Sequence, residues 1–177
     1  KFFPADMAEV SSLENPLINS DAAIICCLIP TYKGFDGTPA KELDDERGYN
    51  EIIKPTVDGC LNILKSAKIN DVKNILICSS TSSTNPIPPV LVKNELDHWS
   101  DEKEQCNSKK YTSAAKTYME RAAFKFCNEN NLRLSVFLPT GLYGPAILPE
   151  HLKHNPFLWI KSVLEGGPPR HLSLIHI

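Results

Sequence analysis

The sequence lacks the features that mark several large classes of protein. Its net charge is only −2 over 177 residues, which gives no electrostatic basis for binding nucleic acid or an anionic membrane. No apolar run approaches the roughly 20 residues that a transmembrane helix needs. A composition of 42% hydrophobic and 23% charged residues instead predicts one soluble globular domain with a substantial core.

Cysteine patterns of the metal-binding and disulfide-rich classes are also missing. The six cysteines include no C-x-x-C pair and form no cluster with histidine at metal-ligand spacing. Four of them lie inside apolar patterns, where cysteine behaves as a small buried hydrophobic residue. Because disulfide frameworks belong to oxidising compartments, we expect a cytoplasmic protein without a disulfide framework or a metal site.

Three short, nearly uninterrupted apolar runs predict strands that are buried on both faces of a parallel sheet: 22–29, 73–78 and 132–138. Between them, apolar residues recur at helical spacing over residues 49–67 and 110–130. Strands that alternate with helices imply parallel pairing and right-handed crossovers. The predicted fold is therefore α/β, a three-layer Rossmann-like doubly wound parallel sheet.

Shorter elements are expected on either side: the tail of a strand at 1–6, a short helix or loop segment at 10–18 and another helix at 157–164. The segment 81–107 is long, polar and proline-rich, and loops of this length are usually functional or disordered. Pro55 marks either a kink in the first long helix or its true first turn. Gly59 in the same helix indicates close packing against the sheet.

A run of six serine and threonine residues, 79–84, directly follows the second apolar run. Ligands bind beyond the carboxyl ends of the strands in open α/β sheets, and hydroxyl groups there can hydrogen-bond a substrate. The alternative is a polar turn that caps the next element. Further along, Tyr111 and Lys116 open the second long helix. A phenol can serve as a proton donor where a nearby cation favours its ionised form.

Together these pieces resemble the Ser…Tyr-x-x-x-Lys site of the extended short-chain dehydrogenase/reductases, the superfamily of the NAD-dependent epimerases and dehydratases. Four stretches in family order carry the resemblance, at residues 53–64, 75–85, 116–123 and 138–145. Within that superfamily, the chain is similar to the dihydroflavonol and cinnamoyl-CoA reductases. The resemblance implies hydride transfer between a nicotinamide cofactor and a small-molecule carbonyl/alcohol pair. The cofactor is NADP or NAD, with NADP slightly favoured.

The resemblance also implies a role for individual residues. Ser80 corresponds to the serine that orients the substrate oxygen, and Tyr111 is the candidate acid/base. Lys116 corresponds to the lysine that binds the nicotinamide ribose and lowers the pKa of the phenol. Further cofactor contacts are implied at strand ends: Asp6 and Met7 at the adenine, Leu28, Ile29 and Pro30 at the phosphates and ribose, Ser79 beside Ser80, and Pro139 and Thr140 at the nicotinamide.

Two departures from the family pattern bear on activity. The glycine-rich loop G-x-x-G-x-x-G is absent, so we expect residues 1–167 to be a partial NAD(P)-binding domain, incomplete at the N-terminus. An exposed apolar patch near residues 24–28 should follow, with no measurable dinucleotide affinity. The second departure is Thr112, which stands four residues before Lys116, whereas Tyr111 is five before it and about 140° around the helix. Either Tyr111 reaches the site from the first turn or the site is impaired.

Several alternatives stay open. The tail at 168–177 is either a genuine terminal strand or sequence that is not native to the protein. The complete protein is either a reductase or another enzyme of the superfamily, namely a nucleotide-sugar epimerase/dehydratase or a hydroxysteroid dehydrogenase. A third alternative is a non-catalytic cofactor-sensing or scaffold relative that has lost its tyrosine. The oligomeric state is not predicted.

Overall fold

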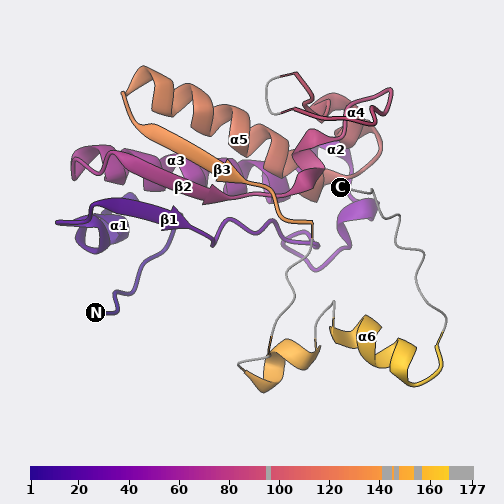
Figure 1. Cartoon of the computed structure of the whole chain (residues 1–177). Helices are drawn as coiled ribbons and strands as arrows, with labels where there is room; N and C mark the ends of the chain where they lie inside the picture. The colour runs from indigo at the N-terminus through magenta and orange to yellow at the C-terminus, as the bar shows by residue number, and fades with distance from the viewer. Residues whose placement is uncertain (95–96, 141–144, 146–147, 154–156, 168–177) are drawn as a thin grey trace. The chain divides into compact units, whose positions relative to one another are not determined.

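The computed structural model describes residues 1–94, 97–140, 145, 148–153 and 157–167 (Figure 1). The chain divides into two units, residues 1–139 and 140–177. In the second unit, the described elements are a 3-10 helix and helix α6, which has the predicted bounds. No helix within the described ranges is long and apolar enough to span a membrane.

The helices and strands follow one another in this order: α1 (Val10–Leu17), β1 (Ala22–Ile25), η1 (Ala40–Glu42), α2 (Asp45–Gly48), the π-helical η2 (Tyr49–Ile53), α3 (Lys54–Ile69), β2 (Asn74–Cys78), η3 (Thr81–Thr84), α4 (Glu102–Asn107), α5 (Tyr111–Glu129), β3 (Arg133–Phe137), η4 (Pro149–Lys153) and α6 (Phe157–Leu164). The strands form one parallel sheet in the order β1-β2-β3. The predicted parallel α/β arrangement is confirmed.

One face of the sheet is covered by α1, α3 and α5. Helices α3 and α5 pack against each other, and α1 packs against α3. Alternate strand residues point into this layer, because successive side chains of a strand lie on opposite faces. The core between sheet and helices includes Ala23, Ile25, Ile75 and Ile77 from the strands, and Cys60, Leu64, Met119 and Ala123 from the helices.

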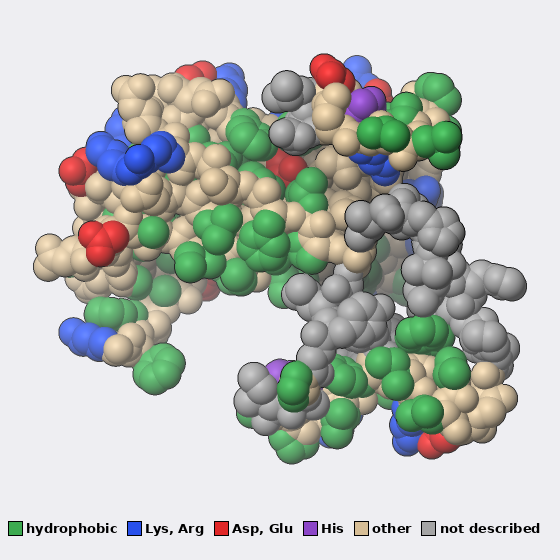
Figure 2. Space-filling model, viewed as in Figure 1, with side chains coloured by type: hydrophobic (Ala, Val, Ile, Leu, Met, Phe, Trp, Pro, Cys, Tyr) green, Lys and Arg blue, Asp and Glu red, His purple; other side chains and the backbone are tan. Residues whose placement is uncertain are grey.

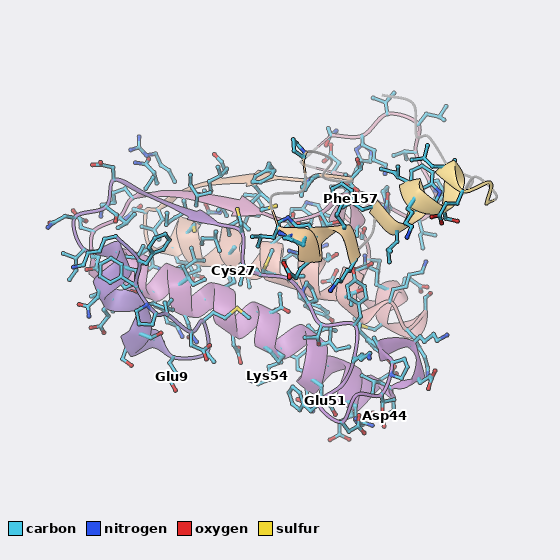
Figure 3. All side chains as sticks on the ribbon, turned by 90° about the horizontal axis from the view of Figure 1, so that it is seen from below. Glu9, Cys27, Asp44, Glu51, Lys54 and Phe157 are labelled. Atoms are coloured by element: carbon cyan, nitrogen blue, oxygen red, sulfur yellow. The ribbon has the colours of Figure 1, made fainter. Side chains whose placement is uncertain are left out.

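The opposite face of the sheet is open in the described part of the chain. Ile25 is buried against the helices, whereas the side chain of Ile24 is 69% exposed. Leu76 and Ser135 continue the row of Ile24 across the sheet. Figure 2 shows hydrophobic side chains along the middle of this face, and Figure 3 shows the strands and α3 as two separate layers. The described residues thus supply the sheet and one helical layer of a doubly wound fold.

The predicted apolar patch near residues 24–28 is confirmed only in part. Ile24, Cys26 and Cys27 are exposed, but Leu28 is fully buried. The strand itself is shorter than predicted: it ends at Ile25, and residues 26–30 form no regular element. The Ile29 N–H donates to the carbonyl oxygen of Cys27 at 2.8 Å. Residues 1–6 pair with none of the three described strands, so the strand tail predicted there was wrong.

The two special residues of the first long helix have clear roles. Pro55 lies in the first turn of α3, directly after the π-helical η2, so it marks the point where the π-helix passes into the α-helix. A Cβ at Gly59 would lie 2.9 Å from the Sδ of Met7. The glycine therefore permits close packing against the segment before α1 and not, as predicted, against the sheet.

The long polar segment between β2 and α5 is folded back on itself. Ser100 donates its N–H to the carbonyl oxygen of Ser83 at 2.8 Å and its Oγ–H to that of Ser82 at 2.6 Å. Trp99 packs edge-on against Phe124, with ring centroids 5.9 Å apart. These contacts hold the end of the segment beside η3.

Candidate active site

A cavity of about 180 Å³ lies where the segment after β1, the turn after β2 and the first turns of α5 meet. Of the predicted site residues, it is lined by Ile29, Pro30, Ser80 and Lys116, together with Tyr32, Ser82, Thr112 and Ser113. The carboxyl ends of two neighbouring parallel strands therefore bring together residues that are far apart in the sequence.

Lys116 is held by the backbone of both strand ends. Its Nζ donates to the carbonyl oxygen of Leu28 and, at 3.4 Å, to that of Cys78, the last residue of β2. Burial lowers the pKa of the ammonium group, while Cys78 and Glu120 act in the opposite direction. The two carbonyl groups fix the position of the cation at the wall of the cavity.

Ser80 caps the element that follows it and also lines the cavity. Its Oγ accepts the N–H of Ser82 at 3.2 Å, and its carbonyl oxygen accepts the N–H of Ser83 at 3.1 Å, so it caps the 3-10 helix η3. The same side chain lines the cavity. Since its Oγ acts as the acceptor in the cap, the hydroxyl proton of Ser80 can be donated to a ligand.

Ser79 does not line this cavity but contacts a carboxyl group that sequence reasoning missed. Its Oγ donates to Oε1 of Glu120, which is buried on α5. Burial raises the pKa of Glu120, while hydrogen bonds from Ser79 and Ser83 and the charge of Lys116 oppose this shift. The available signal was the position of Glu120 four residues after Lys116, on the same face of the helix.

Tyr111 lies outside the cavity. Its Oη donates to Oδ1 of Asp45 at 2.8 Å, and its ring packs so tightly on Gly48 that a Cβ there would lie 2.5 Å from Cε1. Burial, and next the hydrogen bond to Asp45, raises the pKa of Tyr111 to about 12. This shift is opposite to the one expected beside Lys116. The structure does not bring the two side chains together, because a spacing of five residues points them to different sides of α5.

Besides Ser80, four residues with hydroxyl groups line the cavity with Lys116: Tyr32, Ser82, Thr112 and Ser113. Thr112 stands four residues before the lysine, so its half-buried side chain points the same way. Tyr32 comes from the segment after Pro30, and its side chain is 74% exposed. Sequence reasoning missed Tyr32 because no spacing relates a loop residue to a helix.

A second cavity, of about 460 Å³, lies between the segment before α1 and helix α3. Asp6 and Met7, predicted at the adenine, line it together with Gly59 and Asn62. The Nδ2 of Asn62 donates to the carbonyl oxygen of Met7 at 3.0 Å, which fixes this segment on the helix. The two cavities share no lining residue.

The remaining predicted positions lie at or beyond the end of β3. The carbonyl oxygen of Pro139 accepts the N–H of Thr81 at 3.4 Å, next to Ser80. Thr140 is exposed and begins the second unit, and its role stays a prediction. The tail at 168–177 lies outside the described residues. Among the residues that are described, no group of three or more His, Cys, Asp or Glu could hold a metal ion.

The sequence matches a known family. A sequence profile of the NAD dependent epimerase/dehydratase family matches residues 41–175, most of the chain. The chain belongs to this family. Its resemblance to dihydroflavonol reductases, predicted from four short stretches, is confirmed as well. It is 36% identical over 131 residues to a dihydroflavonol 4-reductase of Callistephus chinensis, an alignment that covers 71% of this chain and 35% of that protein.

Other relatives extend the match. The chain is 28% identical over 153 residues to an anthocyanidin reductase of Vitis vinifera, covering 83% of this chain and 42% of that protein. A yeast methylglyoxal/isovaleraldehyde reductase complexed with NADPH has a similar fold, with a TM-score of 0.59 at 16% identity, over 82% of this chain and 44% of that chain. The predicted Rossmann-like fold is confirmed. The chain spans 30% to 42% of the length of these curated relatives.

Proposed function

We propose that the complete protein is an NAD(P)-dependent oxidoreductase that interconverts a carbonyl group and an alcohol of a small molecule by hydride transfer. The observation that carries the proposal is the cavity in which Ser80 and Lys116 meet at the carboxyl ends of β1 and β2. Open α/β sheets bind ligands at this edge. Membership of the NAD dependent epimerase/dehydratase family and similarity to reductases support it.

The residues of the chain fit a dinucleotide at two places. The cavity at Asp6 and Met7 suits the adenine end, and the cavity at Lys116 suits the nicotinamide ribose, with Leu28 to Pro30 between them in this proposal. The 177 residues contain no G-x-x-G-x-x-G loop to bind the pyrophosphate. We therefore expect no measurable affinity of the isolated chain for NADPH by calorimetry, and tight binding would contradict the assignment.

The bound cofactor supplies the hydride, and the protein supplies orientation and a proton. Ser80 donates its hydroxyl proton in a hydrogen bond to the substrate oxygen. The ammonium of Lys116, fixed by the carbonyl of Leu28, binds the ribose and stabilises negative charge that develops on that oxygen. Pro139 and Thr140 are assigned to the nicotinamide, and the six cysteines, all free, suit the reducing cytoplasm.

For the proton donor, the geometry favours Tyr32 over Tyr111. Tyr32 is the phenol that lines the cavity, whereas the Tyr111 hydroxyl is engaged with Asp45. Thr112 lines the cavity too, but an aliphatic hydroxyl is too weak an acid for the role. We assign proton transfer to Tyr32, which lines the cavity together with Lys116.

Lys116→Ala in the full-length protein tests this function. Without the ribose contact and the positive charge, turnover in NADPH-dependent reduction of a dihydroflavonol should fall about 10²–10⁴-fold, as for loss of a general acid–base group. Lys125→Ala is the matched control, because Lys125 lies on the same helix and is exposed. Equal turnover of the two variants would refute the assignment of Lys116.

The second candidate is a relative that binds the cofactor without catalysis. The observation in its favour is Thr112, where the Ser…Tyr-x-x-x-Lys pattern has its tyrosine. Thr112→Tyr restores the four-residue spacing to Lys116. If the full-length protein binds NADPH, and only its Thr112→Tyr variant catalyses turnover, the protein is a relative that has lost its catalytic activity. An epimerase or dehydratase would instead convert nucleotide sugars with no net consumption of NADPH.

A further inference from the structure

Two thiols lie side by side at the ends of β1 and β2. The strands are parallel, and the last pair of their register is Ile25 opposite Ile77, so Cys26 and Cys78 are the residues that directly follow this pair. Ile25 and Ile77 are buried against the helices. Cys78 is the last residue of β2 and follows the buried Ile77, so its half-buried side chain points to the open face, and Cys26, directly after β1, is exposed.

The thiols are close enough to interact. Burial raises the pKa of Cys78, and the neighbouring Cys26 raises it further. Neighbouring strands lie about 4.8 Å apart, and disulfides join residues whose Cα atoms are about 4.4–6.8 Å apart. Rotation of the two side chains, without movement of the strands, is therefore enough to join the sulfur atoms.

The other thiols are set apart from this pair. Cys60 and Cys127 are buried on the helical side of the sheet, and burial raises their pKa values to about 12 and about 11. Such thiols stay protonated and unreactive. Cys27 follows Cys26 directly but has Cys60 and Lys116 among its neighbours. Cys26, and not Cys27, directly follows the last pair of the register, as Cys78 does on β2, so Cys26 is the candidate partner of Cys78.

We propose that Cys26 and Cys78 form a reversible dithiol–disulfide pair, a modification site for low-molecular-weight disulfides of the glutathione disulfide class. The exposed Cys26 loses its proton, and its sulfur attacks one sulfur of the small disulfide, which releases one thiol. Cys78 then loses its proton and displaces the second thiol, and the bond between the two cysteines forms. The protein gives up two electrons and two protons, and the small disulfide takes them up as two thiols.

The bond would connect directly to the candidate active site. Lys116 donates to the carbonyl oxygen of Cys78 itself and to that of Leu28, two residues after Cys26. The disulfide would therefore fix the separation of the two acceptors that hold the ammonium group. An effect on turnover rests on the proposed function, but formation of the bond does not, so the two can fail independently.

Peptide mapping of the full chain after incubation with glutathione disulfide tests the proposal. Free thiols are blocked with iodoacetamide before digestion with trypsin. The sequence places Cys26 and Cys27 in the peptide 2–33 and Cys78 alone in the peptide 74–93. We expect these two peptides to be linked, two of the six thiols to be lost to iodoacetamide, and both to return with dithiothreitol.

Serine variants identify which cysteine of the first peptide is bonded. Cys27→Ser is the matched control and should keep the link, whereas Cys26→Ser and Cys78→Ser should abolish it and leave mixed disulfides. Persistence of the link in Cys26→Ser would overturn the proposal. So would wild-type protein that carries mixed disulfides alone or keeps all six thiols reactive. The peptide map of the wild-type protein alone tests whether the disulfide forms. The outcome therefore does not depend on whether a variant folds.

Discussion

The hydroxyl of Tyr111 donates a hydrogen bond to the carboxylate of Asp45, 66 residues earlier in the chain. Tyr111 is the acid/base candidate of the sequence, but this bond gives its side chain a structural contact. It joins the start of α5 to α2, and Asp44 and Glu51 lie at the same end of α3 (Figure 3). The hydroxyl groups that line the cavity at Lys116 belong instead to Tyr32, Ser80, Ser82, Thr112 and Ser113.

Replacing Tyr111 and Tyr32 separately by phenylalanine distinguishes a structural tyrosine from a catalytic one. In the full-length protein, Tyr111→Phe should leave NADPH-dependent turnover unchanged, because its hydroxyl does not reach the cavity. Tyr32→Phe should lower turnover about 10²–10⁴-fold, the usual range for loss of a general acid. Steady-state rates under saturating NADPH measure both. The reverse order of effects would return the catalytic role to Tyr111.

Gly48→Ala should destabilise the protein by about 1–3 kcal/mol, the usual cost of overpacking a core. The reason is that the added Cβ would lie 2.5 Å from the Tyr111 ring. Urea unfolding followed by circular dichroism measures the change. In a Tyr111→Leu background, which removes the ring, the same substitution should cost less than half as much. Equal costs in both backgrounds would show that the ring is not the cause.

Glu120→Gln should change how stability depends on pH. Burial raises the pKa of Glu120 above its ordinary value of 4.5, so the folded state holds this proton more tightly than the unfolded state. Its contribution is therefore full below pH 4.5 and is lost as the pH rises through the folded-state pKa. The Gln variant, which has no proton to lose, should show a flatter profile in urea unfolding above pH 4.5. Parallel profiles for the two proteins would count against a raised pKa.

Neighbouring isoleucines of β1 should respond very differently to truncation. Ile25→Ala should cost about 2–5 kcal/mol, because the residue is buried between sheet and helices. Ile24→Ala should stay within about 0.5 kcal/mol, since its side chain is 69% exposed on the open face. It should also reduce self-association of the 177-residue chain in sedimentation velocity. A large loss of stability at Ile24 would mean that this face is covered.

Apolar periodicity was sufficient to predict β2, β3 and α5 to within one or two residues, since burial on at least one face leaves a clear pattern. It predicted too long a strand for β1, because the apolar residues beyond Ile25 lie outside the strand. One of them is the buried Leu28, whose carbonyl oxygen accepts a hydrogen bond from Lys116. The open face of the sheet could not be predicted. An uninterrupted apolar run is the same whether one or both faces are covered.

The candidate site was predictable only where helical geometry applies. The five-residue spacing of Tyr111 and Lys116 already indicated that they diverge, and they do. Glu120 follows Lys116 by four residues, but its hydrogen-bond partner Ser79 is 41 residues away in the sequence, and no local pattern relates the two. Tyr32 belongs to a loop whose path is set by tertiary contacts. These positions follow from assembly of the sheet and not from local pattern.

The hydrogen bonds of Lys116 also set an order of events during folding. Its acceptors lie 88 and 38 residues earlier in the chain, one at the end of each of two neighbouring strands. Contacts between residues so far apart in sequence form late, because long loops must close first. The ammonium reaches its final position only after both crossovers have docked. An incompletely folded chain therefore carries no preformed cation site. Activity at this edge of the sheet requires that folding is complete.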